Sequence, residues 1–193
     1  MFEKSITKQE INELPLFKFE GKLVVAADVQ QIDKAIFEIE QFDVVGIDTE
    51  TKPTFKKGEF NHVALIQIAV PDKVYLLRIQ HHGITATLLR FLSNERITKV
   101  GIALDDDIIA LNKRKQFEAK GFVDLNKIAP TIGLENIGAR NLSALLLNVR
   151  ISKNQQVSNW ESPILTTPQL RYAATDAWIC LEMYNKLKGW GYI

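Results

Sequence analysis

The sequence predicts a single α/β domain in which a mixed β-sheet is flanked by helices on both faces. Short apolar runs rich in β-branched residues are grouped in the earlier part of the chain. Segments with helical periodicity lie between these runs and dominate the end of the chain, which is the pattern of a sheet covered by helices. With 193 residues, of which 46% are hydrophobic, the chain is long enough to bury one full core.

The expected elements follow from this pattern in chain order. Strands are predicted over residues 22–27, 44–50, 63–70, 73–79 and 97–103, and residues 121–125 fit a short further strand, which gives a five- to six-stranded sheet. The short link Pro71-Asp72 joins two of these strands into a hairpin. Helices are predicted over residues 29–41, 85–94, 105–116 and 167–188, with broken helical pieces between residues 126 and 148.

Residues 1–21 are expected to form an N-terminal arm that lies against the body, and residues 22–193 to form one domain. The first residues mix both charge signs and lack an apolar core, so they do not resemble a signal peptide. The apolar stretch over residues 63–70 is too short to cross a membrane. We therefore expect a cytoplasmic protein that does not interact with a membrane.

The composition excludes some classes of site. The single cysteine, Cys180, excludes an internal disulfide framework and a Cys-rich zinc site. The three histidines, His62, His81 and His82, are too few and too poorly spaced for the usual structural zinc patterns. The net charge of +1 neither favours nor excludes a nucleic-acid partner, which would need a local basic patch.

The strand predicted over residues 44–50 carries two carboxylates on one side. Asp48 and Glu50 are two residues apart, and side chains alternate in direction along a strand, so both can approach one ligand. Alone, the pair is more typical of the start of a solvated turn. Partners from elsewhere in the chain are needed to make it a site.

Further acidic residues follow in two other elements. The run Asp105-Asp106-Asp107 opens the helix after strand 97–103 and holds more acidic residues than capping needs. In the last helix, Tyr172 and Asp176 are four residues apart and share a face. Sites in open α/β sheets form beyond the carboxyl ends of strands, where Asp48, Glu50 and the acidic run would gather. Such a cluster needs compensating cations, and oxygen ligands select hard ions such as magnesium or manganese.

Three motifs together resemble the 3'-5' exonuclease family of the DEDD superfamily, tyrosine subtype (DEDDy), and are most similar to its Werner-type exonuclease domains. These motifs are Val44-Val45-Gly46-Ile47-Asp48-Thr49-Glu50, Lys99-Val100-Gly101-Ile102-Ala103-Leu104-Asp105-Asp106-Asp107 and Tyr172-Ala173-Ala174-Thr175-Asp176-Ala177. Two supporting stretches are Val63-Ala64-Leu65-Ile66-Gln67-Ile68 and Ser158-Asn159-Trp160. The resemblance spans residues 22 to 188 and implies a ribonuclease H-like exonuclease fold.

The resemblance implies a hydrolase that cleaves phosphodiester bonds from a 3' end, releases nucleoside monophosphates and uses two divalent cations, Mg²⁺ or Mn²⁺. It also implies that Asp48 bridges both ions, that Glu50 and Asp176 complete the first ion site, and that Asp107 holds the second. Within the acidic run, Asp107 is the preferred ligand and Asp106 the alternative. Tyr172 completes the catalytic set by orienting the attacking water, because its ordinary pKa near 10 keeps it protonated.

Nucleic-acid contacts are expected from Lys52 and Lys57 after the first motif, and from Lys153 and Trp160 before the third. Each lysine is equally well explained as ordinary surface charge. Trp160 is a candidate for stacking on a base, although a buried core position explains it better.

Three alternatives follow from the resemblance. The Werner-type likeness favours DNA as the substrate, whereas the wider tyrosine subtype includes ribonuclease D, which makes RNA the second choice. A nucleic-acid-binding module without catalysis is the third. We find no helicase and no accessory RNA-binding segment in these residues, so a separate helicase or repair partner is expected to unwind or target the substrate. The oligomeric state is left open.

Overall fold

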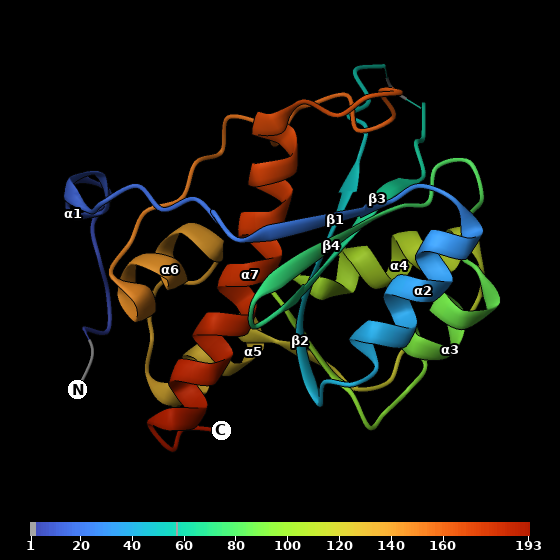
Figure 1. Ribbon diagram of the computed structural model, residues 1–193. Helices are drawn as coiled ribbons and strands as arrows, with labels where there is room; N and C mark the ends of the chain where they lie inside the picture. The colour runs from blue at the N-terminus through green and yellow to red at the C-terminus, as the bar shows by residue number, and fades with distance from the viewer. Residues whose placement is uncertain (1–2, 57) are drawn as a thin grey trace.

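In the computed structural model, which describes residues 3–56 and 58–193, six strands form one mixed sheet (Figure 1). The strand order is β1-β4-β3-β2-β5-β6. The strands are β1 (Lys22–Ala26), β2 (Val44–Thr51), β3 (Val63–Val70), β4 (Lys73–Arg78), β5 (Thr98–Gly101) and β6 (Phe122–Asp124). The β2-β3 and β3-β4 pairs are antiparallel, and the other three pairs are parallel. The predicted mixed sheet is therefore confirmed, with the short sixth strand present.

Helices cover both faces of this sheet, as predicted (Figure 1). One face packs against α2 (Val29–Ile39), α3 (Ala86–Leu92) and α4 (Leu104–Arg114) through a cluster of buried aliphatic and aromatic side chains. The other face packs against α7 (Thr167–Gly189), which α6 (Ala139–Leu147) joins at the β5 side. The observed ends lie within a few residues of the predicted ones.

The segment between β6 and α6 is helical but broken. It contains the short helix α5 (Leu125–Ile128) and a 3₁₀-helix, η1 (Ala129–Ile132), which includes Pro130. Gly133 ends the 3₁₀-helix in a left-handed conformation, with φ of 85°. The broken helical pieces predicted between residues 126 and 148 are thus confirmed.

The start of helix α7 carries strong N-terminal capping signals. Thr166 and Gln169 form a capping box, and Pro168 occupies the first turn, where its missing N–H has no intrahelical partner to lose. In Figure 1, α7 runs as the long orange-red helix across the sheet. No helix in the described part of the chain combines the length and the apolar character that crossing a membrane requires.

The N-terminal segment lies against α7 and the chain that follows α6. The backbone of Phe17 donates to the carbonyl of Arg150 at 2.8 Å, and the Phe17 ring stacks on Trp178 of α7 with centroids 4.9 Å apart. The expected arm therefore does contact the body. It also contains the short helix α1 (Lys8–Glu13), which the sequence analysis did not predict although Thr7 and Glu10 form a capping box at its start.

Candidate metal centre

The acidic pair of the first motif lies inside the central strand β2. This strand pairs with β3 on one side and with β5 on the other. Asp48 and Glu50 project to the same face because side chains alternate along a strand. Thr49, between them, projects to the opposite face. The two carboxylates therefore leave β2 on the side covered by α7.

Small residues let α7 come close enough to complete the cluster. Gly46 on β2 lies directly beneath the helix, and the packed helix surface includes Ala173, Ala174 and Ala177. This contact carries Asp176 over the acidic pair. Asp48, Glu50 and Asp176 each offer a carboxylate oxygen within 4.8 Å of the other two. Residues more than one hundred positions apart in the sequence thus form one compact group.

The cluster is electrostatically unfavourable as long as all its members are ionised. Burial, followed by repulsion from Asp176 and Asp107, raises the pKa of Asp48 well above its ordinary value. Burial and the neighbouring carboxylates raise the pKa of Glu50 to about 10, and burial raises that of Asp176 to about 7. The Lys153 ammonium opposes the shift at Asp176. Without a cation, burial and mutual repulsion therefore favour the protonated carboxyls, and a bound cation would displace these protons.

Asp107 approaches this group from α4 without joining it. A Cβ on Gly101 would come within 2.8 Å of the Ile47 carbonyl oxygen, so only glycine allows the β5-α4 turn to lie this close to β2. The Thr49 hydroxyl donates a hydrogen bond to the Asp107 carboxylate. Burial raises the pKa of Asp107 to about 6, although this hydrogen bond acts to lower it. Asp107 is not among the carboxylates that meet the 4.8 Å spacing in the described chain.

Asp124 orients the start of α4. Its carboxylate accepts from the backbone N–H of Ala103 at 3.0 Å and of Leu104 at 3.1 Å. Ala103 has a φ of 57°, which a residue with a Cβ adopts only when its surroundings enforce it. Asp124 and Thr49 were not predicted as site residues from the sequence. The signal for Asp124 was its place at the end of a short strand, and Thr49 gave none beyond lying between two acidic residues.

Within the acidic run, Asp106 and Asp107 differ in burial and in their effect on the cluster. Asp107 is partly buried and influences the pKa values of Asp48 and Glu50, whereas Asp106 is exposed. Asp105 is also exposed and forms an ion pair with Lys127 at 2.7 Å. Asp107 is therefore the member of the run whose charge acts on the cluster.

Tyr172 lies one turn before Asp176 on the same face of α7. Burial, followed by repulsion from Asp176 and Glu50, raises the pKa of Tyr172 above its ordinary value. Its hydroxyl donates a hydrogen bond to Asp176, which opposes the rise in the pKa of that carboxyl. Tyr172 is therefore a neutral donor at any physiological pH, as the sequence analysis expected.

A cavity of ≈ 220 Å³ opens onto these groups. Its wall contains the three clustered carboxylates and Tyr172, and the loop before α7 adds Lys153 and Gln156. Of the described residues predicted for nucleic-acid binding, Lys153 reaches this cavity. Its position beside Asp176 suits a phosphate group next to the cluster.

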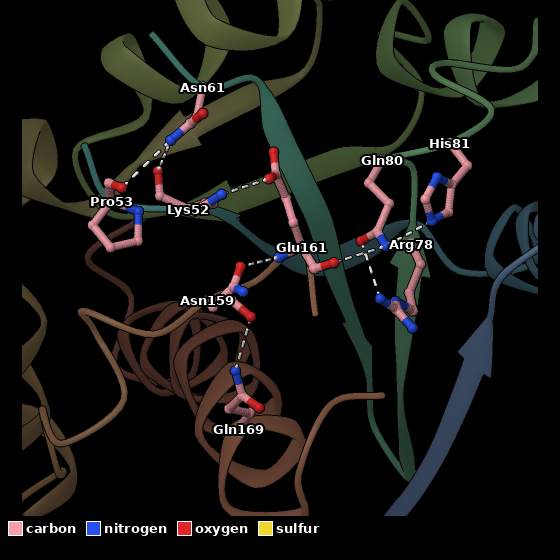
Figure 2. A network of polar contacts seen from close by, with 9 residues as sticks. All are labelled: Lys52, Pro53, Asn61, Arg78, Gln80, His81, Asn159, Glu161 and Gln169. Carbon is pink, nitrogen blue, oxygen red and sulfur yellow. Dashed lines mark hydrogen bonds and ion pairs between the residues drawn. The ribbon is translucent and has the colours of Figure 1, made fainter. Parts of the chain in front are cut away.

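The other predicted nucleic-acid contacts lie differently. Lys52 forms an ion pair with Glu161 at 3.3 Å, which joins the loop after β2 to the loop before α7 (Figure 2). Lys57 lies outside the described residues. Trp160 is 0% exposed and packs in the core with its ring 6.1 Å from that of Tyr172. No base can reach a ring buried in this way, so the stacking expectation for Trp160 is wrong and the core position is confirmed.

The donor chemistry of the cluster fits hard divalent cations. All three clustered donors are carboxylate oxygens, which suit Mg²⁺ and Mn²⁺. The nearby thiol of Cys180 donates to the backbone oxygen of Asp176 at 3.1 Å, and burial raises its pKa well above the ordinary value. It therefore remains a protonated thiol and adds no soft ligand.

The chain matches a known protein family over most of its length. A family model described as 3'-5' exonuclease matches residues 23–189. The chain belongs to this exonuclease family of the DEDD superfamily. The mouse bifunctional 3'-5' exonuclease/ATP-dependent helicase WRN is 32% identical over 204 residues, which cover 98% of this chain and 14% of that protein. A 3'-5' exonuclease of Arabidopsis thaliana is 29% identical over 200 residues, covering 95% of this chain and 69% of that protein.

Solved structures share the exonuclease fold. The EXO domain of Aedes aegypti Nibbler matches with a TM-score of 0.81 and 23% identity, over 90% of this chain and 91% of that one. Escherichia coli RNase D matches with a TM-score of 0.74 and 20% identity, over 91% of this chain and 47% of that one. The expected ribonuclease H-like fold is therefore confirmed.

Proposed function

We propose that this chain is a two-metal-dependent 3'-5' exonuclease of the tyrosine subtype, which hydrolyses nucleic acid from a 3' end and releases nucleoside monophosphates. The observation that carries the proposal is the convergence of Asp48, Glu50 and Asp176, with oxygens within 4.8 Å of one another. Membership of the 3'-5' exonuclease family supports the direction and the reaction class. DNA is the favoured substrate, in keeping with the likeness to Werner-type domains.

The carboxylates are assigned as cation ligands. Asp48 would contact both ions, Glu50 and Asp176 would complete the first site, and Asp107 would hold the second. Two divalent cations supply charge stabilisation for the attacking and leaving oxygens of an in-line displacement. The raised pKa values mean that each carboxyl must release its proton as the site is loaded, so loading is favoured by higher pH.

Tyr172 and Lys153 act on the substrate rather than on the cations. The Tyr172 hydroxyl, fixed by its hydrogen bond to Asp176, orients the attacking water towards phosphorus. Tyr172 does not serve as the base, because its raised pKa keeps the phenol protonated. Lys153 places a positive charge at the cavity wall, where a non-bridging phosphate oxygen would be paired.

The partners proposed are a nucleic acid with a free 3' end and a separate unwinding or repair protein. The chain spans 14% of the mouse relative, whose name joins an exonuclease to a helicase. The proposed partner would unwind or target the substrate and leave a 3' end open to the cavity.

The decisive experiment uses matched 5'-labelled DNA and RNA oligonucleotides, single-stranded and 3'-recessed, with Mg²⁺ or Mn²⁺ or neither. The wild type should shorten DNA stepwise from the 3' end and release mononucleotides, and Asp48→Ala should abolish this. Asp107→Ala should also lose activity, whereas Asp106→Ala serves as the exposed neighbour that keeps it.

Three other outcomes would favour an alternative function or an alternative ligand. Faster cleavage of RNA than of DNA would favour an exoribonuclease of the ribonuclease D type. Binding of 3' ends without turnover under any divalent ion would favour a binding module that has lost catalysis. Loss of activity in Asp106→Ala but not in Asp107→Ala would overturn the assignment of Asp107.

A further inference from the structure

Gln67 lies on β3 and has no role in the chemistry proposed above. In the antiparallel β2-β3 register, Gln67 stands directly opposite Asp48. Residues directly opposite one another in such a pair project to the same face of the sheet, with Cβ atoms about 4.5–5.5 Å apart. The Gln67 side chain therefore enters the layer between the sheet and α7 beside the Asp48 carboxylate.

The Gln67 amide is fully buried, with 0% exposure, and unsatisfied. Neither Nε2 nor Oε1 has a hydrogen-bond partner among the described residues. Its neighbours on this face of β3, Leu65 and Ala69, belong to an apolar cluster with Ala173 and Ala177 of α7. A buried amide without partners is destabilising, and an apolar side chain of similar shape would fit these surroundings better. Stability alone therefore does not explain a glutamine here.

The Asp48 carboxylate, in turn, can accept a hydrogen bond from a nearby side chain. This carboxylate receives a hydrogen bond from the backbone N–H of Thr49 and, among the described residues, none from a side chain. Carboxylates that bind cations are as a rule held in orientation by hydrogen bonds from other groups. A neutral amide can provide such a donor without adding a positive charge that would compete with the cations. An ammonium group at this position would repel them.

We propose that Gln67 is a positioning residue for Asp48, donating from Nε2 to the Asp48 carboxylate when the site is loaded with divalent cations. The inference rests on the proposed function, because it concerns the carboxylate assigned to both ions. The amide fixes which way the Asp48 oxygens point and so raises the affinity of the site. It makes no contact with the substrate and takes no part in proton transfer.

The test compares Gln67→Met with Leu65→Met. Methionine matches glutamine in length and lacks the amide, and Leu65 lies on the same face of β3 opposite Glu50, with 0% exposure. Affinity for Mn²⁺ alone is measured by electron paramagnetic resonance on protein without nucleic acid. Gln67→Met should weaken Mn²⁺ binding by about tenfold or more. Leu65→Met should bind Mn²⁺ as the wild type does.

Thermal unfolding in EDTA provides the second readout. Gln67→Met should be as stable as the wild type or more stable, because it removes two unsatisfied polar atoms from the core. Raising the Mn²⁺ concentration should restore its exonuclease rate, since the chemical groups are unchanged. A purely structural role would give the opposite pattern, with lower stability and unchanged Mn²⁺ affinity.

The failure of this inference can be told from that of the proposed function. A wild type that binds Mn²⁺ and cleaves, together with a Gln67→Met variant of equal Mn²⁺ affinity, would overturn the role of Gln67 alone. A wild type that binds no Mn²⁺ would overturn both. Gln67→Leu is the second variant if the methionine variant does not fold, and failure of both to fold would show that the amide is structural and overturn the inference.

Discussion

Gly46 of β2 and Ala177 of α7 are in such close contact that a Cβ on Gly46 would lie 2.0 Å from the Ala177 carbonyl oxygen. The obstructing atom belongs to the helix backbone, so it cannot rotate away as a side chain would. Asp48 lies two residues after Gly46, and Asp176 immediately precedes Ala177. The same contact that packs the helix on the sheet therefore sets the separation of two clustered carboxylates.

Gly46→Ala is expected to push α7 away from β2. Overpacking of a well-packed core typically costs about 1–3 kcal/mol, and a backbone obstruction places this variant at the upper end. Chemical denaturation should show the loss of stability, and Mn²⁺ binding should weaken because Asp176 moves. Gly189→Ala is the matched control, because a Cβ there meets no atom within 4 Å. Equal stability of the two variants would contradict the importance of this contact.

Much of the fold could be predicted from the sequence because it depends on local periodicity. The apolar runs of β3 and β4 and the capping signals of α7 each lie within one short stretch. The convergence of Asp48 with Asp176 does not, since it depends on packing between distant elements. The sequence motifs indicated this convergence only through a family resemblance. The close contact between β2 and α7 that permits it depends on the missing side chain of Gly46.

Other features of the site could not be predicted because they depend on neighbours distant in sequence. Lys52 has the charge expected of a phosphate contact, but the fold brings Glu161 within 3.3 Å of it. Thr49 belongs to the first motif, yet its partner Asp107 comes from another helix. Trp160 could be read either way until its burial was known.

Thr49→Val should raise the pKa of Asp107 above its present value of about 6. The hydroxyl of Thr49 donates to the Asp107 carboxylate and so stabilises its ionised form. Valine keeps the branched shape and removes the donor. Carbon-detected NMR titration of the Asp107 carboxyl in metal-free protein measures the effect. Thr49→Ser retains the hydroxyl and should leave the titration close to that of the wild type, whereas equal pKa values in Thr49→Val and wild type would contradict this interpretation.

The metal-free protein should lose stability as the pH rises from about 5 to about 7.5. The pKa values of Asp107, Asp176 and Glu50 are raised to about 6, about 7 and about 10, above the values near 4 of an unfolded chain. Over this range the native state binds more protons than the unfolded state, so stability falls with rising pH. Burial lowers the pKa of Lys99 only to about 8, which keeps this lysine out of the range.

Thermal unfolding in EDTA at several pH values measures this dependence, and two comparisons identify its source. Asp176→Asn should flatten the decline, because it removes one of the titrating groups. Saturating Mn²⁺ should abolish the decline, since the loaded carboxylates hold no protons and those of the unfolded chain are already ionised above pH 5. A metal-free stability that rises through this range would show that the cluster is not the dominant titrating element.

At a pH well above the pKa of Asp176, Tyr172→Phe should lower the exonuclease turnover number by about 100-fold while leaving Mn²⁺ affinity nearly unchanged. The hydroxyl is assigned to the attacking water, and Tyr172 is not one of the clustered carboxylates. Its loss also removes the hydrogen bond that acts against the rise in the pKa of Asp176, so that pKa should increase above about 7. The pH at which activity reaches half its maximum should therefore move upwards, as Asp176 must be ionised in the loaded site. Tyr184→Phe, farther along α7, is the matched control and should alter neither quantity. If Tyr172→Phe weakened Mn²⁺ binding as strongly as it slowed turnover, the tyrosine would act through Asp176 rather than on the water.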